Sequence, residues 1–177
     1  MRKVSVAVAA CCLGLAVLVV ACGAQDKSKR PSPPATASFD LGGTKITIDY
    51  SSPRLKGRHV GGEIAPYGQI WRVGANEATT FVTTGNITVG GTAVPAGSYT
   101  IFAVPEKDKW TLVISKKTGE WGTAYPGPSD DLARIPMKVS TLPSSVENFT
   151  ISFEKTGMGV NLNLDWDTTR ASVAISK

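Results

Sequence analysis

The sequence predicts an all-β fold, an antiparallel β-sandwich or jelly-roll-like domain of about nine strands that follows an N-terminal signal segment. From Phe39 onward, apolar and polar residues alternate, which is the period of a half-buried strand. The 177-residue chain contains 18 glycines and 11 prolines, which supply frequent turns. No long amphipathic helix separates the alternating segments, so the pattern disfavours a βαβ architecture.

The N-terminal segment has the layout of an export signal. Arg2 and Lys3 give it a positive start, and residues 4–20 form an uninterrupted run of apolar and small residues. An uncleaved transmembrane helix stays open as an alternative, because the run approaches the roughly 20 residues that a span needs. Residues 19–23, Val-Val-Ala-Cys-Gly, resemble the bacterial lipobox, whose cysteine is lipidated. The resemblance implies a signal peptide over residues 1–21 and a mature chain that begins at Cys22.

Residues 22–37 are predicted to be a flexible linker between the lipid and the domain. They are polar, and Pro31, Pro33 and Pro34 stiffen them toward an extended conformation. Several acyl chains on Cys22 would anchor the protein stably, so a membrane is an expected partner. Gly23 rather than aspartate follows the cysteine, which by the usual sorting rules favours the outer membrane, facing the periplasm, in a cell that has one.

A single domain is expected over residues 38–177, because a chain of this size forms one core. Ile46, Ile48 and Tyr50 share one face of the first predicted strand. Further strands are predicted around residues 79–84, 87–89, 98–104, 110–115, 135–139, 149–153, 160–166 and 173–175. Trp110 and Trp166 fall on apolar faces and are assigned to the core. The irregular segment 116–132 either covers a binding site or caps the core.

Charge and cysteine content exclude several classes of function. The net charge of +5 comes largely from the leader and the linker, which leaves the domain close to neutral. Its basic residues neither share one periodic face nor interleave with aromatics, so no nucleic-acid partner is expected. All three cysteines lie within the first 22 residues, and His59 is the single histidine. The usual ligands of a transition-metal site are therefore missing, and neither a metal nor a cofactor is predicted.

Neither the two-residue period of a strand nor the period of an amphipathic helix persists between residues 50 and 81. Arginine, asparagine, glutamate and threonine lie there among glycines and aromatics. Such a segment cannot bury an apolar face, so its polar groups must pair with one another, with backbone or with a ligand. Within it the sequence reads Lys56-Gly57-Arg58, then Pro66-Tyr67-Gly68, and then the unbroken run from Trp71 to Thr80, W-R-V-G-A-N-E-A-T-T.

These residues closely resemble the hallmark of a bacterial family catalogued as domain of unknown function 2911. The resemblance continues through Ala96-Gly97-x-Tyr99, Trp110, Trp121-Gly122, Tyr125, Asp131, Arg134 and Leu164-x-Trp166, and covers nearly all of residues 38–177. The chain departs from the family at Ser51-Ser52 and at the added Pro126-Gly127-Pro128. The resemblance implies a secreted, mainly β domain that is often lipid-anchored, and it implies no reaction.

The leading hypothesis is a noncatalytic envelope protein that binds a small polar or anionic ligand, or a protein partner, through this block. Arginine forks suit carboxylate or phosphate, and aromatic rings offer stacking faces. The candidate ligand-binding residues are Arg54, Arg58, Arg72, Asn76, Glu77, Thr79, Tyr67 and Trp71. The alternative is a purely structural network in which Asn76 and Glu77 satisfy turns and the tryptophans fill the core.

Two further classes stay open. A hydrolase or isomerase could use Glu77 as its acid or base, paired with Asp130 or Asp131, unless Glu77 forms an ion pair with Arg72 or Arg58. A Ser-His-Asp mechanism is disfavoured because His59 lies in a loop-like segment and no G-x-S-x-G motif occurs. Calcium at Asp130 and Asp131 is a weaker alternative. A structural role in envelope assembly predicts a long, apolar, unpaired edge strand.

Overall fold

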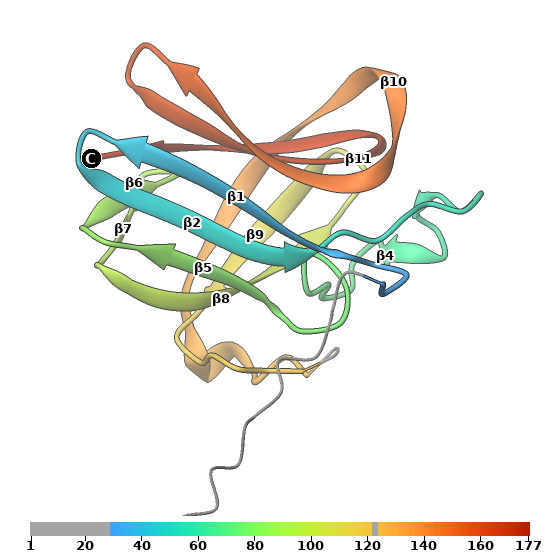
Figure 1. Ribbon diagram of the computed structural model, residues 1–177, viewed down its shortest axis with the longest axis horizontal. Helices are drawn as coiled ribbons and strands as arrows, with labels where there is room; N and C mark the ends of the chain where they lie inside the picture. Colours follow the sequence, from blue (N-terminus) through green and yellow to red (C-terminus); the bar gives the residue numbers. More distant parts are fainter. Residues whose placement is uncertain (1–28, 122–123) are drawn as a thin grey trace, which may run out of the picture.

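Strands make up most of the protein in the computed structural model, which describes residues 29–121 and 124–177 (Figure 1). The strands are β1 (Pro34–Leu41), β2 (Thr44–Ser51), β3 (Val60–Gly61), β4 (Ile64–Pro66), β5 (Thr79–Thr83), β6 (Ile87–Val89), β7 (Thr92–Val94), β8 (Gly97–Pro105), β9 (Lys109–Ser115), β10 (Asp131–Thr156) and β11 (Gly159–Ser176). Nine of them form one antiparallel sheet in the order β1-β2-β5-β8-β9-β10-β11-β6-β7. The predicted all-β, sandwich-like fold is confirmed.

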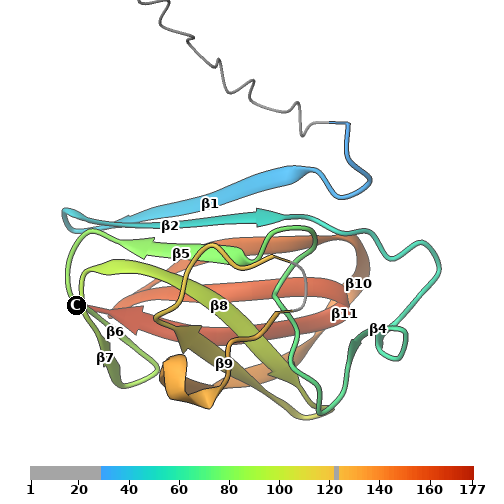
Figure 2. The same cartoon turned by 90° about the horizontal axis from the view of Figure 1, so that it is seen from below.

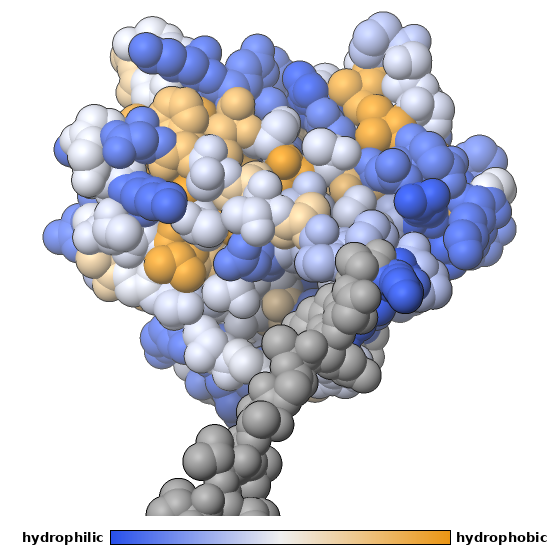
Figure 3. Space-filling view, in the orientation of Figure 1, coloured by the Kyte–Doolittle hydropathy of each residue, from blue (hydrophilic) through white to orange (hydrophobic). Residues whose placement is uncertain are grey.

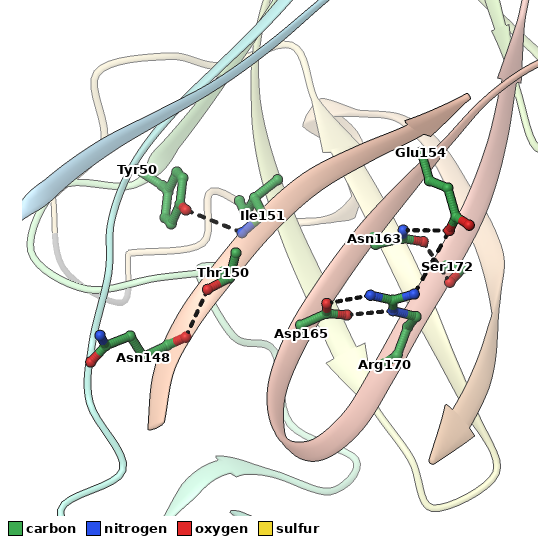
Figure 4. Close-up of polar contacts among 9 residues, drawn as sticks. All are labelled: Tyr50, Asn148, Thr150, Ile151, Glu154, Asn163, Asp165, Arg170 and Ser172. Carbon is green, nitrogen blue, oxygen red and sulfur yellow. Dashed lines mark hydrogen bonds and ion pairs between the residues drawn. The ribbon is translucent and has the colours of Figure 1, made fainter. Parts of the chain in front are cut away.

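The sheet curls because β10 and β11 bend sharply along their length. Ser172 Oγ donates to Asn163 Oδ1 at 2.8 Å, and Arg170 donates to both carboxylate oxygens of Asp165 at 2.8 and 2.7 Å. All four residues belong to β11, so the two arms of this strand face each other across a polar network (Figure 4). Asp167 lies at the bend with φ +54°. The sequence predicts two strands in each of these regions, and the structure joins each pair into one bent strand.

The curl brings the first strand against the end of the tenth (Figures 1 and 2). The rings of Phe39 and Phe153 pack with centroids 5.9 Å apart. The side of β1 that carries Ala37, Phe39 and Leu41 therefore packs on the core, while its other side chains are exposed. Strand β1 begins at Pro34, so four residues of the predicted linker, 34–37, are part of the sheet.

A cluster of aromatic rings forms the centre of one end of the core. Trp71 stacks on Trp166 with centroids 5.5 Å apart and meets Trp110 and Phe149 edge-on at 6.0 and 4.9 Å. Trp110 and Trp166 are 1% and 2% exposed, as their alternation predicts. Such edge-to-face and stacked pairs add to the free energy already gained by burying the rings.

The segment after β9 covers the outer face of β8 and β9. The Tyr125 ring packs edge-on against Phe102, and its hydroxyl donates to Asp131 Oδ2 at 2.8 Å. Arg134 donates to that same Asp131 oxygen and to the Tyr125 hydroxyl. The segment also includes a 3-10 helix (Pro128–Asp130). In the described part of the chain, no helix is long and apolar enough to span a membrane. The predicted signal peptide and Cys22 lie outside the described residues.

Candidate functional site

The segment from Trp71 to Thr80 crosses one end of the sandwich in a strained conformation. Trp71 and Ala103 exchange backbone hydrogen bonds of 2.7 and 2.8 Å, which fixes the start of the segment on β8. Val73 and Asn76 then have φ values of +55° and +57°. A positive φ is a true outlier for a β-branched residue such as valine. Thr79 is buried and its hydroxyl donates to the Val73 carbonyl at 2.7 Å, which helps to hold this turn.

The turn opens a cavity of about 280 Å³, which we call the arginine pocket. Its walls include Arg58, Ile64, Ala65, Trp71, Arg72 and Trp166. The stacked pair Trp71 and Trp166 gives the pocket a rigid aromatic wall, while the two arginines supply its charge. Ala65, with φ +44°, is another strained residue. Strained backbone is retained where the surrounding structure forces it, which is common at binding sites.

Arg72 is the arginine of this pocket whose guanidinium has the fewest partners. Its side chain has no hydrogen bond or ion pair with any residue in 29–121 or 124–177. Burial lowers the pKa of the Arg72 guanidinium below its ordinary value, although the group stays charged at neutral pH. Arg58 uses part of its guanidinium on the Leu55 and Arg54 carbonyls, both at 3.0 Å. The lining contains no carboxylate, so the pocket offers donors without a matching acceptor.

The other predicted arginine lies outside the pocket. Arg54 is exposed, and its backbone forms an isolated bridge with Asn148. Tyr67 is 46% exposed, and its ring lies directly against Gly61, where an added Cβ would come within 2.2 Å of it. Figure 3 shows hydrophilic surface at the end of the molecule that carries β4. Of the predicted site residues, the arginine pocket therefore gathers Arg58, Trp71 and Arg72.

Asn76 and Glu77 contact the segment that precedes β1. Arg30 Nη1 lies 2.9 Å from each carboxylate oxygen of Glu77, and Asn76 Nδ2 donates to the Ser32 carbonyl at 3.0 Å. Ser52 donates its backbone N–H to the Pro33 carbonyl at 2.9 Å. Residues 30–33 are thus fastened across the end of the sandwich. The arginine partner of Glu77 is Arg30, whereas the sequence suggests Arg72 or Arg58.

A second cavity, of about 450 Å³, lies on the other side of this contact, and we call it the acceptor hollow. Its polar and aromatic walls are formed by Thr36, Asp49, Tyr50, Glu77, Glu120 and Trp121. Thr36 comes from β1 and the next two residues from β2, while the last two belong to the segment after β9. The arginine pocket contains Gly74 and Ala75, and the acceptor hollow contains Glu77 and Ala78. The two cavities therefore flank the same short run of the hallmark.

Asp131, one of the two aspartates suggested as a catalytic partner of Glu77, has hydrogen-bond partners of its own. Asp131 Oδ2 accepts hydrogen bonds from Tyr125 and Arg134, and the ion-pair partner of Glu77 is Arg30. Both oxygens of Glu77 face the Arg30 guanidinium. In the parts of the chain that the structure describes, no group of three histidine, cysteine or acidic side chains could hold a metal ion.

His59 contacts Asp167 rather than a serine. His59 Nδ1 lies 3.1 Å from one Asp167 oxygen, and Ser145 Oγ donates to the other oxygen at 3.2 Å. Burial would raise the pKa of Asp167, but the hydrogen bonds from His59 and Ser145 outweigh it and hold the pKa below its ordinary value. A serine hydrolase needs the histidine between the serine and the acid. The order found here does not provide a base for the serine.

Sequence reasoning missed the residues that complete both cavities. Ser32 of the arginine pocket falls in the predicted linker, and Asp49 of the acceptor hollow lies on the polar face of an ordinary alternating strand. One feature of the sequence did point to the acceptor hollow. Trp121 lies within the long irregular segment 116–132, and in the structure its side chain lines the hollow.

The comparisons with known proteins identify a family but no characterised relative. No curated protein and no solved structure matches the chain. One family model, described as protein of unknown function (DUF2911), matches residues 32–175. The match spans the hallmark run, both cavities and the whole sheet except the last residue of β11, and on this basis the chain belongs to the DUF2911 family.

Proposed function

We propose that this protein is a lipid-anchored protein of the cell envelope that binds a small anionic ligand in the arginine pocket without transforming it. The carrying observation is Arg72, a partly buried cation with no hydrogen-bond or ion-pair partner among the described residues, which faces the pocket beside Arg58. A buried charge without a partner is costly. A carboxylate or phosphate group would remove that cost, because it accepts two parallel hydrogen bonds from a guanidinium.

The shape of the pocket limits the ligand. A volume of about 280 Å³ is close to the lower end of small-molecule sites. The Trp71 and Trp166 rings give it an apolar wall, so a ligand with one anionic group and a compact apolar or ring-shaped body fits best. Because the two tryptophans are held by packing in the core, the pocket is formed before the ligand binds. Binding therefore costs little conformational entropy.

An Arg72→Ala variant should weaken binding of the anion about 10- to 100-fold, because a charge-assisted hydrogen bond contributes about 1.5–3 kcal/mol. Calorimetric titration with inorganic phosphate, sulfate, dicarboxylates and sugar phosphates measures the effect. Arg54→Ala is the matched control, since Arg54 carries the same charge but lies outside the pocket. Equal losses in the two variants would contradict the proposal, and so would the absence of any binding anion.

The envelope location rests on the lipobox-like residues 19–23 and on the apolar run before them. A Cys22→Ser variant should accumulate as an unprocessed precursor, because the acceptor thiol is gone. Fractionation of cells and immunoblotting of the mature and precursor forms would measure this. Normal cleavage of the variant would contradict lipid anchoring. The same distribution of the variant and the native chain between membrane and soluble fractions would contradict it too.

The edge strand gives less support to envelope assembly by strand addition. Strand β1 is an eight-residue edge, but its apolar residues Ala37, Phe39 and Leu41 pack against the core. The side chains on its outer side are Pro34, Thr36, Ser38 and Asp40, which are polar or cannot continue a ladder. An edge of this kind opposes further pairing, so ligand binding is the better supported role.

A further inference from the structure

The acceptor hollow has the dimensions and construction of a second binding site. Its volume of about 450 Å³ falls within the range of small-molecule sites. Its walls come from β1, β2, the residues before β5 and the segment after β9, which are far apart in the sequence. Ala78 N–H donates to the Glu120 carbonyl at 3.1 Å, and Glu77 forms a backbone bridge with Trp121. These bonds hold two of the walls in place.

The polar lining of the hollow accepts hydrogen bonds more readily than it donates them. Asp49, Glu77 and Glu120 contribute carboxylates. Arg30 pairs with Glu77 and Lys117 lies 4.0 Å from Glu120, but no lysine, arginine or histidine belongs to the lining itself. Asp49 Oδ1 accepts from the Thr36 hydroxyl at 2.6 Å. Each carboxylate has about four lone-pair sites, so acceptor capacity is left over. The lining therefore suits a ligand that carries several hydrogen-bond donors.

Besides the hydrogen-bond acceptors, the hollow has aromatic side chains on which a ligand can pack. Trp121 is 62% exposed at the hollow, although large aromatic side chains are usually well buried. Tyr50 lines the hollow too, and its ring is fixed edge-on against Phe149 with centroids 5.7 Å apart. Its hydroxyl accepts from the Ile151 N–H at 3.1 Å (Figure 4). Burial raises the pKa of Tyr50, so the hydroxyl stays protonated.

From this combination we propose that the acceptor hollow binds a saccharide, separately from the anion in the arginine pocket. A sugar ring has an apolar face of C–H groups and an edge of hydroxyls. The face packs on the indole of Trp121, and the hydroxyls donate to Asp49 and Glu120. The same geometry disfavours a purely apolar ligand, which would displace water from the carboxylates without replacing its hydrogen bonds.

The two cavities lie close enough to serve one molecule. Residues 75 to 78 span at most about 11 Å even when fully extended. Ala75 belongs to the arginine pocket and Ala78 to the acceptor hollow, so the gap between their walls is no larger than that. Binding of a neutral sugar therefore tests the hollow alone, because such a sugar offers the arginines of the neighbouring pocket no anionic group.

The test uses the full chain in detergent and titrates it with neutral disaccharides, with glucosamine oligomers and with sugar phosphates, followed by tryptophan fluorescence and calorimetry. Trp121→Ala and Asp49→Asn should each weaken binding of a neutral or amino saccharide about tenfold or more. Met158→Ala is the matched control, since Met158 is 92% exposed and lies in the β10–β11 turn. Thermal melting of each variant shows that it is folded.

The outcomes separate the two sites. If saccharide binding survives Arg72→Ala and is lost in Trp121→Ala, the hollow is a distinct sugar site. If no saccharide binds, or if Trp121→Ala binds as well as the Met158→Ala control, the proposal is overturned while anion binding at Arg72 is unaffected. Binding of sugar phosphates but not of neutral or amino saccharides, lost only in Arg72→Ala, also overturns it, because the phosphate alone would then explain the affinity.

Discussion

Replacing Trp71 with alanine should lower the free energy of unfolding by about 3–5 kcal/mol, the usual cost of removing a large aromatic side chain from a core. Trp71 stacks on Trp166 and meets Trp110 and Phe149 edge-on, so its removal leaves a void among three rings. These neighbours come from β9, β10 and β11, whose strand geometry limits how far they can close the gap. Urea denaturation followed by circular dichroism would measure the change.

Trp121→Ala is the control for this experiment, because Trp121 is 62% exposed and should change stability by less than about 1 kcal/mol. A Trp71→Phe variant should recover part of the loss, since phenylalanine keeps some of the ring contacts. If Trp71→Ala were as stable as the control, the ring would not contribute to the core as described. Its expected double role, core ring and pocket wall, requires the large stability loss.

The fold was predictable where one face of a strand is buried. Ile46 and Ile48 are completely buried while Lys45, on the opposite face of β2, is exposed, so the alternation in the sequence mirrors the two faces of the strand. Trp110 and Trp166 follow the same rule. Where an element alternates and one face is covered, burial alone determines which residues face the core, and local sequence contains that information.

The bends in β10 and β11 could not be predicted in this way. Residues 140–148 are mostly exposed and show no alternation, so the sequence resembles a connection between two strands. In the structure the strand continues through this region with register shifts after Thr141 and after Val146. Contacts such as Asn163 with Ser172 exist only once the two arms meet. Such pairing depends on tertiary geometry, which a local period does not contain.

The candidate site was predictable in composition but not in arrangement. The excess of polar residues in the hallmark drew attention to Arg58 and Arg72, because a polar segment without periodicity must find partners, and both residues line the same cavity. It did not reveal that Asn76 and Glu77 contact Ser32 and Arg30, which are 44 and 47 residues away. Short-range patterns also could not place Asp49 beside Trp121. Both cavities are built from segments that only the curled sheet brings together.

The close approach of the two arms of β11 makes Gly159 irreplaceable in this fold. A Cβ on Gly159 would lie 2.2 Å from the Ile175 carbonyl oxygen, and the residue has φ +155°. The clash is with backbone in the ladder between β11 and β6, where Ile175 pairs with Val89, so it cannot be relieved by rotating a side chain. Gly159→Ala must therefore separate the arms of the strand or distort its first residues.

Gly159→Ala should consequently lower the free energy of unfolding by about 3 kcal/mol or more, which combines overpacking with backbone strain. Gly157→Ala is a close control: Gly157 is two residues away, nothing lies within 4 Å of its added Cβ, and it should cost less than about 1 kcal/mol. Denaturation midpoints of the two variants give the comparison. Since the bend of β11 also places Trp166 under Trp71, Gly159→Ala should reduce anion affinity as well, whereas equal stability of the two variants would mean that the arms do not meet as closely as described.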